Sequence, residues 1–293
     1  MVSFYLYGLS LIWWRYVLDQ QNLIRAALRE DIGHGDVTTL ALVRADARCR
    51  VRLHAKQGGV ASGMGVFRGV FDELDADVAE WSAMDDGARF AGGDTLVSFA
   101  GATRAVLSGE RVALNFVQRL SGIATQTAAM AERVQGLPVR ICDTRKTTPL
   151  LRALEKQAVL HGGGANHRFG LYDGVLIKEN HIAAAGGVGE AVRRAARHAH
   201  HLMKIECEVT DLDEFDEAVA AGAQVILLDN MPLDAMREAV KRAKGSGVLL
   251  EASGNVTLER VRAIAETGVD IISAGSLTHS APAIDLSLDI SNA

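Results

Sequence analysis

The stretch from residue 203 to residue 230, MKIECEVTDLDEFDEAVAAGAQVILLDN, decides the fold of this chain. It opens with a short apolar run at residues 203–209 and ends with another at residues 224–228. Between the two runs, residues 211–221 have the amphipathic spacing of a helix. Strand, helix and strand in this order form the repeating unit of a parallel α/β sheet.

The same alternation continues on both sides of this stretch. Further apolar runs lie at residues 139–142, 174–177, 248–250 and 269–273, and further amphipathic helical segments lie at residues 187–199, 233–244 and 257–266. The last helix has a capping residue at Asn255 or Thr257 and a glycine, Gly268, just beyond its end. A closed eight-stranded barrel needs about 250 residues, so we expect a smaller or incomplete barrel. An open doubly wound sheet remains the alternative.

The first third of the chain mixes strands and helices without a strict repeat. Residues 51–55 and 95–100 are predicted strands, and residues 65–72 are a predicted helix, which is typical of an α+β module. A long helical stretch follows at residues 108–130. We expect it to break near Ser121 and Gly122, because glycine is a poor residue for a helix interior.

Composition excludes several classes of protein. The net charge of −5 argues against a general nucleic-acid binder, which normally presents a basic face. Cys49, Cys142 and Cys207 form no close pair and no metal-ligand spacing, which indicates a reducing, cytoplasmic setting. Residues 1–17 are mostly apolar and aromatic, but they lack the flanking signals of a signal peptide. They are also too short for a membrane span, so we expect either a start codon placed too far upstream or a helix packed on a neighbouring subunit.

Positively charged residues gather beside glycines or where the predicted strands end. They are Arg145, Lys146, His167, Arg168 and Lys178, to which Arg111 is added from the long helix. In a parallel barrel the carboxyl ends of the strands converge on one mouth, where ligands bind. Arginine pairs bidentately with carboxylate and phosphate, so this set predicts a small ligand with several negative charges. A lone arginine of this kind would more often form a surface ion pair.

Three carboxylates are predicted at the same mouth. Glu206 and Glu208 share one face of a strand, because side chains alternate, and Asp229 ends a strongly apolar strand. Carboxylates beside phosphates usually serve Mg²⁺ or accept hydrogen bonds from ribose hydroxyls. The alternative, that the carboxylate only neutralises neighbouring cations, stays open for Glu206.

Two tripeptides of small residues follow the last two predicted strands. They are Ser253, Gly254 and Asn255 after one strand, and Ala274, Gly275 and Ser276 after the next. Loops after the late strands of barrels often bind a phosphate through backbone N–H groups, and small residues allow its close approach. The glycines at residues 162–164 fit neither the dinucleotide-binding nor the P-loop spacing.

Five motifs together resemble the quinolinate phosphoribosyltransferases (nicotinate-nucleotide pyrophosphorylase, carboxylating). They are residues 30–39 (EDIGHGDVTT), 108–115 (SGERVALN), 143–149 (DTRKTTP), 162–173 (GGGANHRFGLYD) and 176–181 (LIKENH). The resemblance extends from residue 22 to the C-terminus. Leu150 departs from it, since the family usually has glycine after the proline, and this puts the start of the following helix in doubt.

This resemblance implies an α/β fold in which an N-terminal α/β sandwich precedes an incomplete α/β barrel of the type II phosphoribosyltransferase kind. The implied boundaries are residues 1–20 for the apolar extension, 21–115 for the sandwich, 116–278 for the barrel, and 279–293 for a segment that returns to the N-terminal domain. The resemblance also implies a homodimer in which Arg111 reaches the site of the partner subunit.

The resemblance implies roles for individual residues as well. Thr144, Arg145, Lys146, His167, Arg168 and Lys178 match positions that hold the two carboxylates of the substrate and the pyrophosphate. Glu208 and Asp229 match positions near the ribose and Mg²⁺, either directly or through water or substrate. The two small-residue loops match the phosphate site, with His279 close by. Lys146, Lys178, Glu208 and Asp229 are the implied catalytic residues, and either lysine could attend the decarboxylation.

The implied reaction converts quinolinate and phosphoribosyl pyrophosphate into nicotinate mononucleotide, pyrophosphate and CO₂. One rival is the related protein of molybdate-transport operons. Nicotinate phosphoribosyltransferase is a second, although a monocarboxylate would need fewer cations. A catalytically silent homologue is a third, and the full charge set argues against it.

Overall fold

The computed structural model describes residues 20–292, so the apolar extension predicted at the N-terminus lies outside the described residues. The chain forms two compact units. The first contains the chain up to residue 125 together with residues 148–162 and the segment from residue 281 onward. The second contains residues 126–147 and 163–280.

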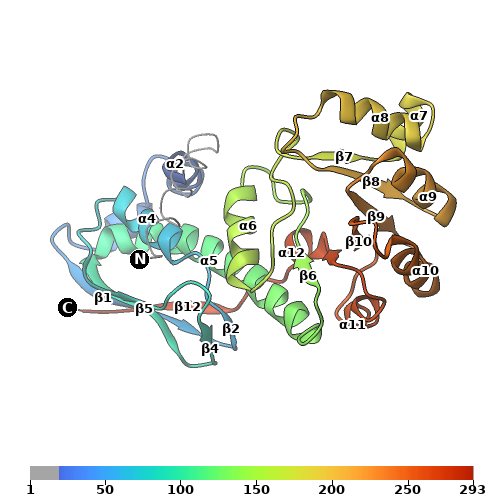
Figure 1. Ribbon diagram of the computed structural model, residues 1–293. Helices are drawn as coiled ribbons and strands as arrows, with labels where there is room; N and C mark the ends of the chain where they lie inside the picture. Colours follow the sequence, from blue (N-terminus) through green and yellow to red (C-terminus); the bar gives the residue numbers. More distant parts are fainter. Residues whose placement is uncertain (1–19, 293) are drawn as a thin grey trace, which may run out of the picture. The chain divides into compact units, whose positions relative to one another are not determined.

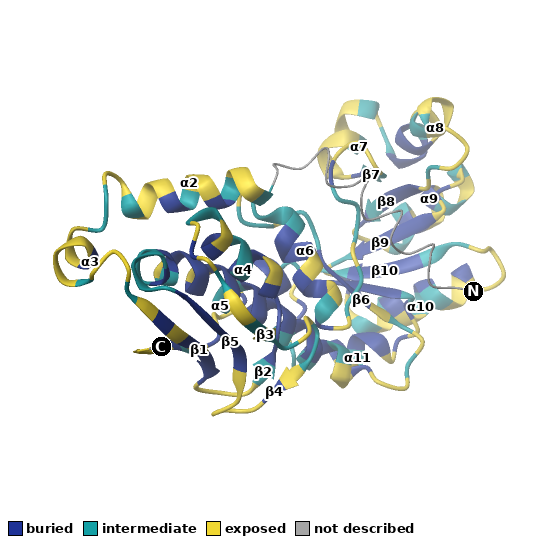
Figure 2. Ribbon diagram, turned by 90° about the vertical axis from the view of Figure 1, so that its left-hand side faces the viewer, coloured by how far each residue is buried: buried dark blue, intermediate teal, exposed yellow. Residues whose placement is uncertain are grey.

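The first unit is built on a four-stranded antiparallel sheet. Its strand order is β12, β1, β5, β3, for Leu286–Asn292, Arg48–Ala55, Thr95–Ala102 and Ala79–Ala83. The C-terminal strand β12 is therefore the neighbour of β1. Buried and exposed residues alternate along the first half of β1, because successive side chains point to opposite faces of the sheet (Figure 2). A second, two-stranded sheet pairs β2 (Gly59–Val60) with β4 (Arg89–Phe90).

Helices complete the first unit. They are α2 (Gln20–Ile32), α3 (Val37–Leu42), α4 (Met64–Glu73), most of α5 (Thr103–Arg133) and α6 (Arg152–His161). Four aromatic side chains join α4 to the sheet, with ring centroids 5.2 Å apart for Phe67 and Phe71, 5.1 Å for Phe71 and Phe99, and 5.6 Å for Trp81 and Phe99. Such aromatic contacts supply much of the apolar area that a small core buries.

Helix α5 does not break where we predicted. It is continuous through Ser121 and Gly122, so that prediction is wrong. The buried hydroxyl of Ser121 donates to the carbonyl oxygen of Ser62 at 3.2 Å. A Cβ atom on residue 122 would lie 2.0 Å from the carbonyl oxygen of Pro282. Glycine is therefore present because another segment passes very close to the helix, and not because the helix ends there.

The second unit contains a six-stranded, fully parallel sheet (Figure 1). Its order is β6, β11, β10, β9, β8, β7, for Arg140–Cys142, Ile271–Ser273, Leu249–Ser253, Val225–Asp229, Ile205–Val209 and Val175–Ile177. The first strand of the unit thus pairs with the last, as in a barrel, while among the described residues no pairing joins β6 to β7. The predicted α/β fold, with a sheet-containing N-terminal domain and a parallel-sheet domain, is confirmed.

The helices of the second unit lie between its strands along the chain, except the last helix, which follows β11. They are α7 (Glu179–Ala185), α8 (Val188–His198), α9 (Leu212–Ala221), α10 (Leu233–Ala243), α11 (Val261–Ala265) and α12 (Ser276–His279). Helices α8 to α11 lie along the outer side of the sheet (Figure 1). The helix predicted at residues 257–266 is shorter than expected, because Thr257 starts a turn that precedes α11. No helix within residues 20–292 has both the length and the apolar character needed to cross a membrane.

Candidate active site

Polar side chains follow the parallel strands at one edge of the second unit. Glu208 on β8 lies beside Leu227 of β9, and Asp229 at the end of β9 lies beside Ser253 of β10. Because all these strands are parallel, their carboxyl ends meet at the same edge of the sheet, which is where barrels bind ligands. The strand ends that we predicted to converge therefore do so.

A buried aspartate connects the two cationic segments. Asp143, which directly follows β6, is fully buried and accepts hydrogen bonds from Asn166 Nδ2 at 2.6 Å and from the backbone N–H of His167 at 2.9 Å. The segment with Arg145 is thereby joined to the segment with Arg168. Charge-assisted hydrogen bonds of this kind are strong, so they fix the loop geometry.

The two arginines concentrate positive charge. Burial lowers the pKa of Arg168, and the neighbouring charge of Arg145 lowers it further, while Glu206 and Asp173 oppose the shift. One Arg168 nitrogen, Nη1, donates to the carbonyl oxygen of Gly174 at 2.9 Å, which holds the guanidinium in place. Two cations that repel one another are stabilised when an anion binds between them, so this part of the site is suited to a carboxylate or a phosphate.

Ion pairs and amide hydrogen bonds hold the carboxylates at the strand ends. Lys178, which follows β7, forms an ion pair with Glu208. Asp229 accepts a hydrogen bond from Asn230 Nδ2 at 3.1 Å, and Asn255 Nδ2 donates to Asn230 Oδ1 at 2.9 Å. A ligand anion that binds Lys178 would release Glu208 for a second partner.

In the small-residue loops, neighbouring side chains approach the glycine backbone so closely that a larger residue would collide with them. A Cβ atom on Gly254, whose φ is +89°, would lie 2.3 Å from Asn230 Oδ1. One on Gly275 would lie 2.9 Å from Lys146 Cδ and 3.2 Å from His279 Nε2. Beside it, the buried hydroxyl of Ser276 has no hydrogen-bond partner within the described chain. Glycine backbone beside a lysine and an unused hydroxyl suits a phosphate group.

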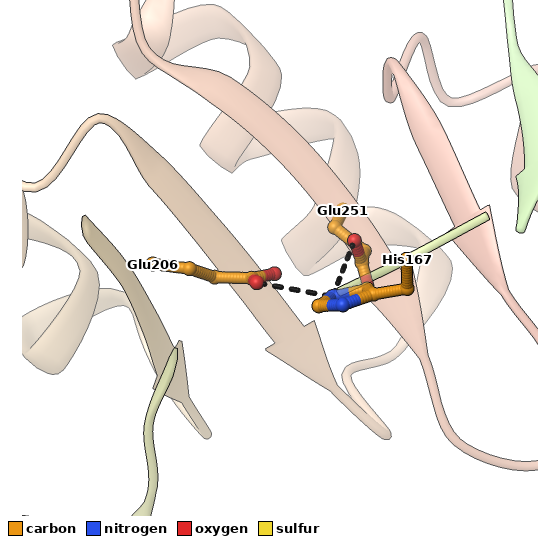
Figure 3. A group of neighbouring side chains, drawn as sticks. All are labelled: His167, Glu206 and Glu251. Carbon is orange, nitrogen blue, oxygen red and sulfur yellow. Dashed lines mark ion pairs between the residues drawn. The ribbon is translucent and has the colours of Figure 1, made fainter. Parts of the chain in front are cut away.

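A histidine and two glutamates form a buried cluster at the centre of this unit (Figure 3). His167 Nε2 lies 3.1 Å from Glu206 Oε2 and 3.6 Å from Glu251 Oε2. Burial raises the pKa of Glu251 to about 7, and the neighbouring charge of Glu206 contributes to the shift. Glu251 was not among the residues predicted to form the site. Its signal was an acidic residue inside the otherwise apolar strand β10.

Two other predicted residues occupy different environments. Arg111 is an exposed residue of α5 in the first unit. Thr144 Oγ1 accepts a hydrogen bond from the backbone N–H of Lys146 at 3.1 Å, so this hydroxyl shapes the loop. Among the remaining predicted residues of the second unit, His167 and Arg168 lie in the segment between α6 and β7. The others lie at the carboxyl ends of the strands or in the segments that follow them.

Comparison with known protein families agrees with this arrangement. The quinolinate phosphoribosyl transferase N-terminal domain matches residues 36–121, and the C-terminal domain of the same family matches residues 123–289. The chain belongs to this family. The strand ends, the cationic segments and both small-residue loops all lie within the C-terminal family domain, while Arg111 lies within the N-terminal one.

Individual relatives cover nearly the whole chain. A probable nicotinate-nucleotide pyrophosphorylase [carboxylating] of Bacillus subtilis is 44% identical over 273 residues, which is 93% of this chain and 94% of that protein. The nicotinate-nucleotide pyrophosphorylase [carboxylating] of Mycobacterium leprae is 42% identical, over 92% of this chain and 96% of its own. The crystal structure of NadC from Streptococcus pyogenes is 41% identical with a TM-score of 0.88, covering 93% of this chain and 96% of that one.

Proposed function

We propose that this protein transfers the phosphoribosyl group of phosphoribosyl pyrophosphate to quinolinate with loss of CO₂, yielding nicotinate mononucleotide and pyrophosphate for NAD biosynthesis. The family and the names of its relatives support this reaction. The observation that carries the proposal is the pairing, at one sheet edge, of a cationic segment with small-residue loops suited to phosphate. The reaction needs both, because one substrate is a dicarboxylate and the other carries several phosphates.

The cations would hold quinolinate. Arg145 and Arg168 present guanidinium groups whose mutual repulsion an anion relieves, and Lys178 can exchange Glu208 for a substrate carboxylate. Two carboxylates on one ring engage such a set better than the single carboxylate of nicotinate. Arginine also suits a planar carboxylate geometrically, because its fork pairs with both oxygens.

The small-residue loops and carboxylates would hold phosphoribosyl pyrophosphate. Glycine at residues 254 and 275 allows a close approach to the backbone, and Ser276 offers an unused hydroxyl. Asp229 and Glu208 can accept hydrogen bonds from ribose hydroxyls. Both positions lie at the ends of neighbouring strands.

Magnesium fits this site as an ion whose remaining ligands come from the substrate and from water. Glu208 and Asp229 are oxygen ligands, and the one group of three potential metal ligands within residues 20–292 lies elsewhere, at His167, Glu206 and Glu251. Mg²⁺ is commonly bound through one or two carboxylates plus substrate phosphates. When bound, it would neutralise charge on the departing pyrophosphate.

The protein groups act by position and charge. The pyridine nitrogen attacks the anomeric carbon of the ribose while the bond to pyrophosphate breaks, and Lys146 and Arg168 stabilise the departing anion. The bond from the ring to the carboxylate beside the nitrogen then breaks, so that CO₂ leaves and the electron pair stays on the ring carbon. Lys146 or Lys178 supplies the proton that this carbon takes up.

We further propose that the protein acts in the cytoplasm as a homodimer in which Arg111 serves the site of the partner subunit. Its exposure on α5 leaves the guanidinium accessible for such a role. Mixing two inactive variants, Arg111→Ala and Arg145→Ala, tests the arrangement. Mixed dimers would contain one site with both arginines, so activity should return to about a quarter of the wild-type value. Activity that stays absent in mixed dimers would contradict the arrangement.

The reaction itself is tested with purified protein, Mg²⁺, phosphoribosyl pyrophosphate and either quinolinate or nicotinate. We expect mononucleotide product and CO₂ from quinolinate only, followed by mass spectrometry. Omitting Mg²⁺ should abolish product formation. Product from nicotinate would contradict the assignment, and absence of product from both would favour the molybdate-operon relative or a silent homologue.

A further inference from the structure

The loop that carries Lys146 and the proposed phosphate loop, residues 274–276, leave neighbouring strands of the second unit. Cys142 ends β6 and pairs with Ser273, which ends β11. The backbone N–H of Ala274 continues this pairing, since it donates to the carbonyl oxygen of Cys142 at 3.0 Å. Beyond this point both segments leave the sheet, so the sheet hydrogen bonds no longer fix the distance between the two loops.

Two threonine hydroxyls hold the main chain of Lys146. Its N–H donates to Thr144 Oγ1 at 3.1 Å, and its carbonyl oxygen accepts a hydrogen bond from Thr278 Oγ1 at 2.7 Å. Thr144 belongs to the same loop, so its contact shapes that loop only locally. Thr278 is 132 residues away along the chain, in α12, which begins within the phosphate loop. The contact with Thr278 is therefore the one that fixes Lys146 relative to the phosphate loop.

The side chain of Lys146 depends on this main-chain contact. The residue is exposed, and its ammonium forms no ion pair with any side chain in the described part of the chain. Its aliphatic stem lies against the backbone of Gly275, where a Cβ atom would be only 2.9 Å from Lys146 Cδ. A lysine without an ion pair has many accessible rotamers, so its direction follows from the position of its main chain and from the surface on which its stem packs.

We propose that Thr278 is a positioning residue that keeps Lys146 at the phosphate loop, so that the ammonium and the loop bind the same phosphate-bearing substrate. Thr278 is fully buried, so its hydroxyl acts through Lys146 and not by touching the substrate. The phosphate loop is also held from α5, where Gln126 Nε2 donates to the carbonyl oxygen of Ser276 at 3.1 Å. Because Gln126 holds the loop independently, loss of the Thr278 hydroxyl should move Lys146 and leave the loop in place.

Steady-state kinetics test this role, which rests on the proposed function because it assigns Lys146 to phosphoribosyl pyrophosphate. Valine at position 278 keeps the shape of threonine and removes the hydroxyl. We expect Thr278→Val to raise the KM for phosphoribosyl pyrophosphate about fivefold to tenfold, as for one lost hydrogen bond, with the KM for quinolinate changed less than about twofold. Thr278→Ser keeps the hydroxyl and should restore the first KM to within about twofold of wild type.

Thr267→Val is the matched control. Thr267 is also buried, and its hydroxyl donates to the carbonyl oxygen of Ile264 at 2.6 Å, just after α11. This variant should lower the melting temperature as Thr278→Val does, but it should change neither KM. Equal kinetics in the two valine variants would show that Thr278 only stabilises the fold, and would overturn the proposal. A Thr278→Ser variant no better than Thr278→Val would overturn it as well.

Titration calorimetry with pyrophosphate and Mg²⁺ tests whether the effect passes through Lys146, because it follows binding without turnover. Thr278→Val should weaken pyrophosphate binding in the wild-type background. In protein that already carries Lys146→Met, the same substitution should cause no further loss, because both changes act through one group. A further loss in that background, or no binding of pyrophosphate to wild type, would contradict the proposal.

Hydrogen exchange followed by mass spectrometry tests the geometry without reference to activity. Peptides that cover residues 143–147 should exchange faster in Thr278→Val than in wild type, while peptides that cover residues 274–276 should be unchanged. Unchanged exchange at residues 143–147 would overturn the proposal. A wild-type protein without activity would refute the proposed reaction, whereas the exchange experiment would still decide whether Thr278 holds this loop.

Discussion

The buried Glu251 makes the stability of this protein depend on pH. Its residue is 2% exposed, and burial raises its pKa from 4.5 to about 7. In the unfolded chain the carboxyl returns to its ordinary pKa. Between these two values the native protein keeps a proton that the unfolded chain has released. The contribution of Glu251 to the free energy of unfolding is therefore greatest below about pH 4.5. This contribution is lost as the pH rises through about 7.

The magnitude follows from the two pKa values. A shift of one pKa unit corresponds to about 1.4 kcal/mol. The difference between the folded and unfolded pKa values of Glu251 therefore lowers the free energy of unfolding above pH 7 by about 3 kcal/mol relative to acidic pH. Replacing Glu251 with glutamine keeps the shape and a hydrogen-bond donor toward Glu206 but removes the ionisation. For a domain of this size, the melting temperature of Glu251→Gln should therefore exceed that of wild type by about 5 °C at pH 8. At pH 4.5 the difference should nearly vanish.

Differential scanning calorimetry of both proteins from pH 4.5 to pH 8 measures this difference directly. Subtracting the melting temperatures of the two proteins at each pH removes the effect of every titrating group that both proteins contain. Glu155→Gln is the matched control, because Glu155 is fully buried but accepts hydrogen bonds from Arg119 at 3.0 Å and Thr148 Oγ1 at 2.8 Å. That variant should be less stable than wild type. A Glu251→Gln difference that does not grow with pH would refute the reasoning.

Three backbone positions give further predictions. Leu150 is 63% exposed with φ at +67°, so Leu150→Gly should raise the free energy of unfolding by about 0.5–1 kcal/mol, measured by denaturant titration. Gly122→Ala should lower the free energy of unfolding by about 3 kcal/mol, because the added Cβ meets a carbonyl oxygen. Gly65→Ala in α4 is the control and should be neutral or stabilising, because its Cβ meets nothing within 4 Å. Gly275→Ala should raise the KM for phosphoribosyl pyrophosphate about tenfold with an unchanged melting temperature, since the Cβ meets no backbone atom but only the side chains of Lys146 and His279 at the proposed phosphate site. Unchanged kinetics in this last variant would place the phosphate elsewhere.

The parallel sheet could be predicted because its signal is local. Each strand of the second unit is a short apolar run, and each helix has an apolar stripe, so the pattern is present within a few dozen residues. The convergence of Glu208 and Asp229 followed from the same pattern, since parallel strands place their ends at one edge. Even the small residues at Gly254 and Gly275 were visible from their place after the late strands.

Contacts between distant segments could not be predicted in this way. The sequence near Gly122 predicts a broken helix, because glycine weakens a helix considered alone. The segment that passes beside it at Pro282 is more than 150 residues away along the chain. Leu150 illustrates the complementary case, since a resemblance indicated an unusual residue there and the structure shows a left-handed backbone at that position.

The acidic residues within apolar strands show how more of the site could have been found. A carboxylate that leaves water costs several kcal/mol unless it gains a partner or keeps its proton. An acidic residue in a strand as apolar as β10 therefore implies a compensating group, which here is His167 from a segment 84 residues away. The same reasoning applies to Glu206, whose alternation with Cys207 and Glu208 on β8 predicted one shared face. That face carries two different environments, because Glu208 pairs with Lys178 near the strand end while Glu206, two residues earlier on β8, pairs with His167. A buried acid in such a strand therefore indicates a partner side chain that a distant segment of the chain supplies.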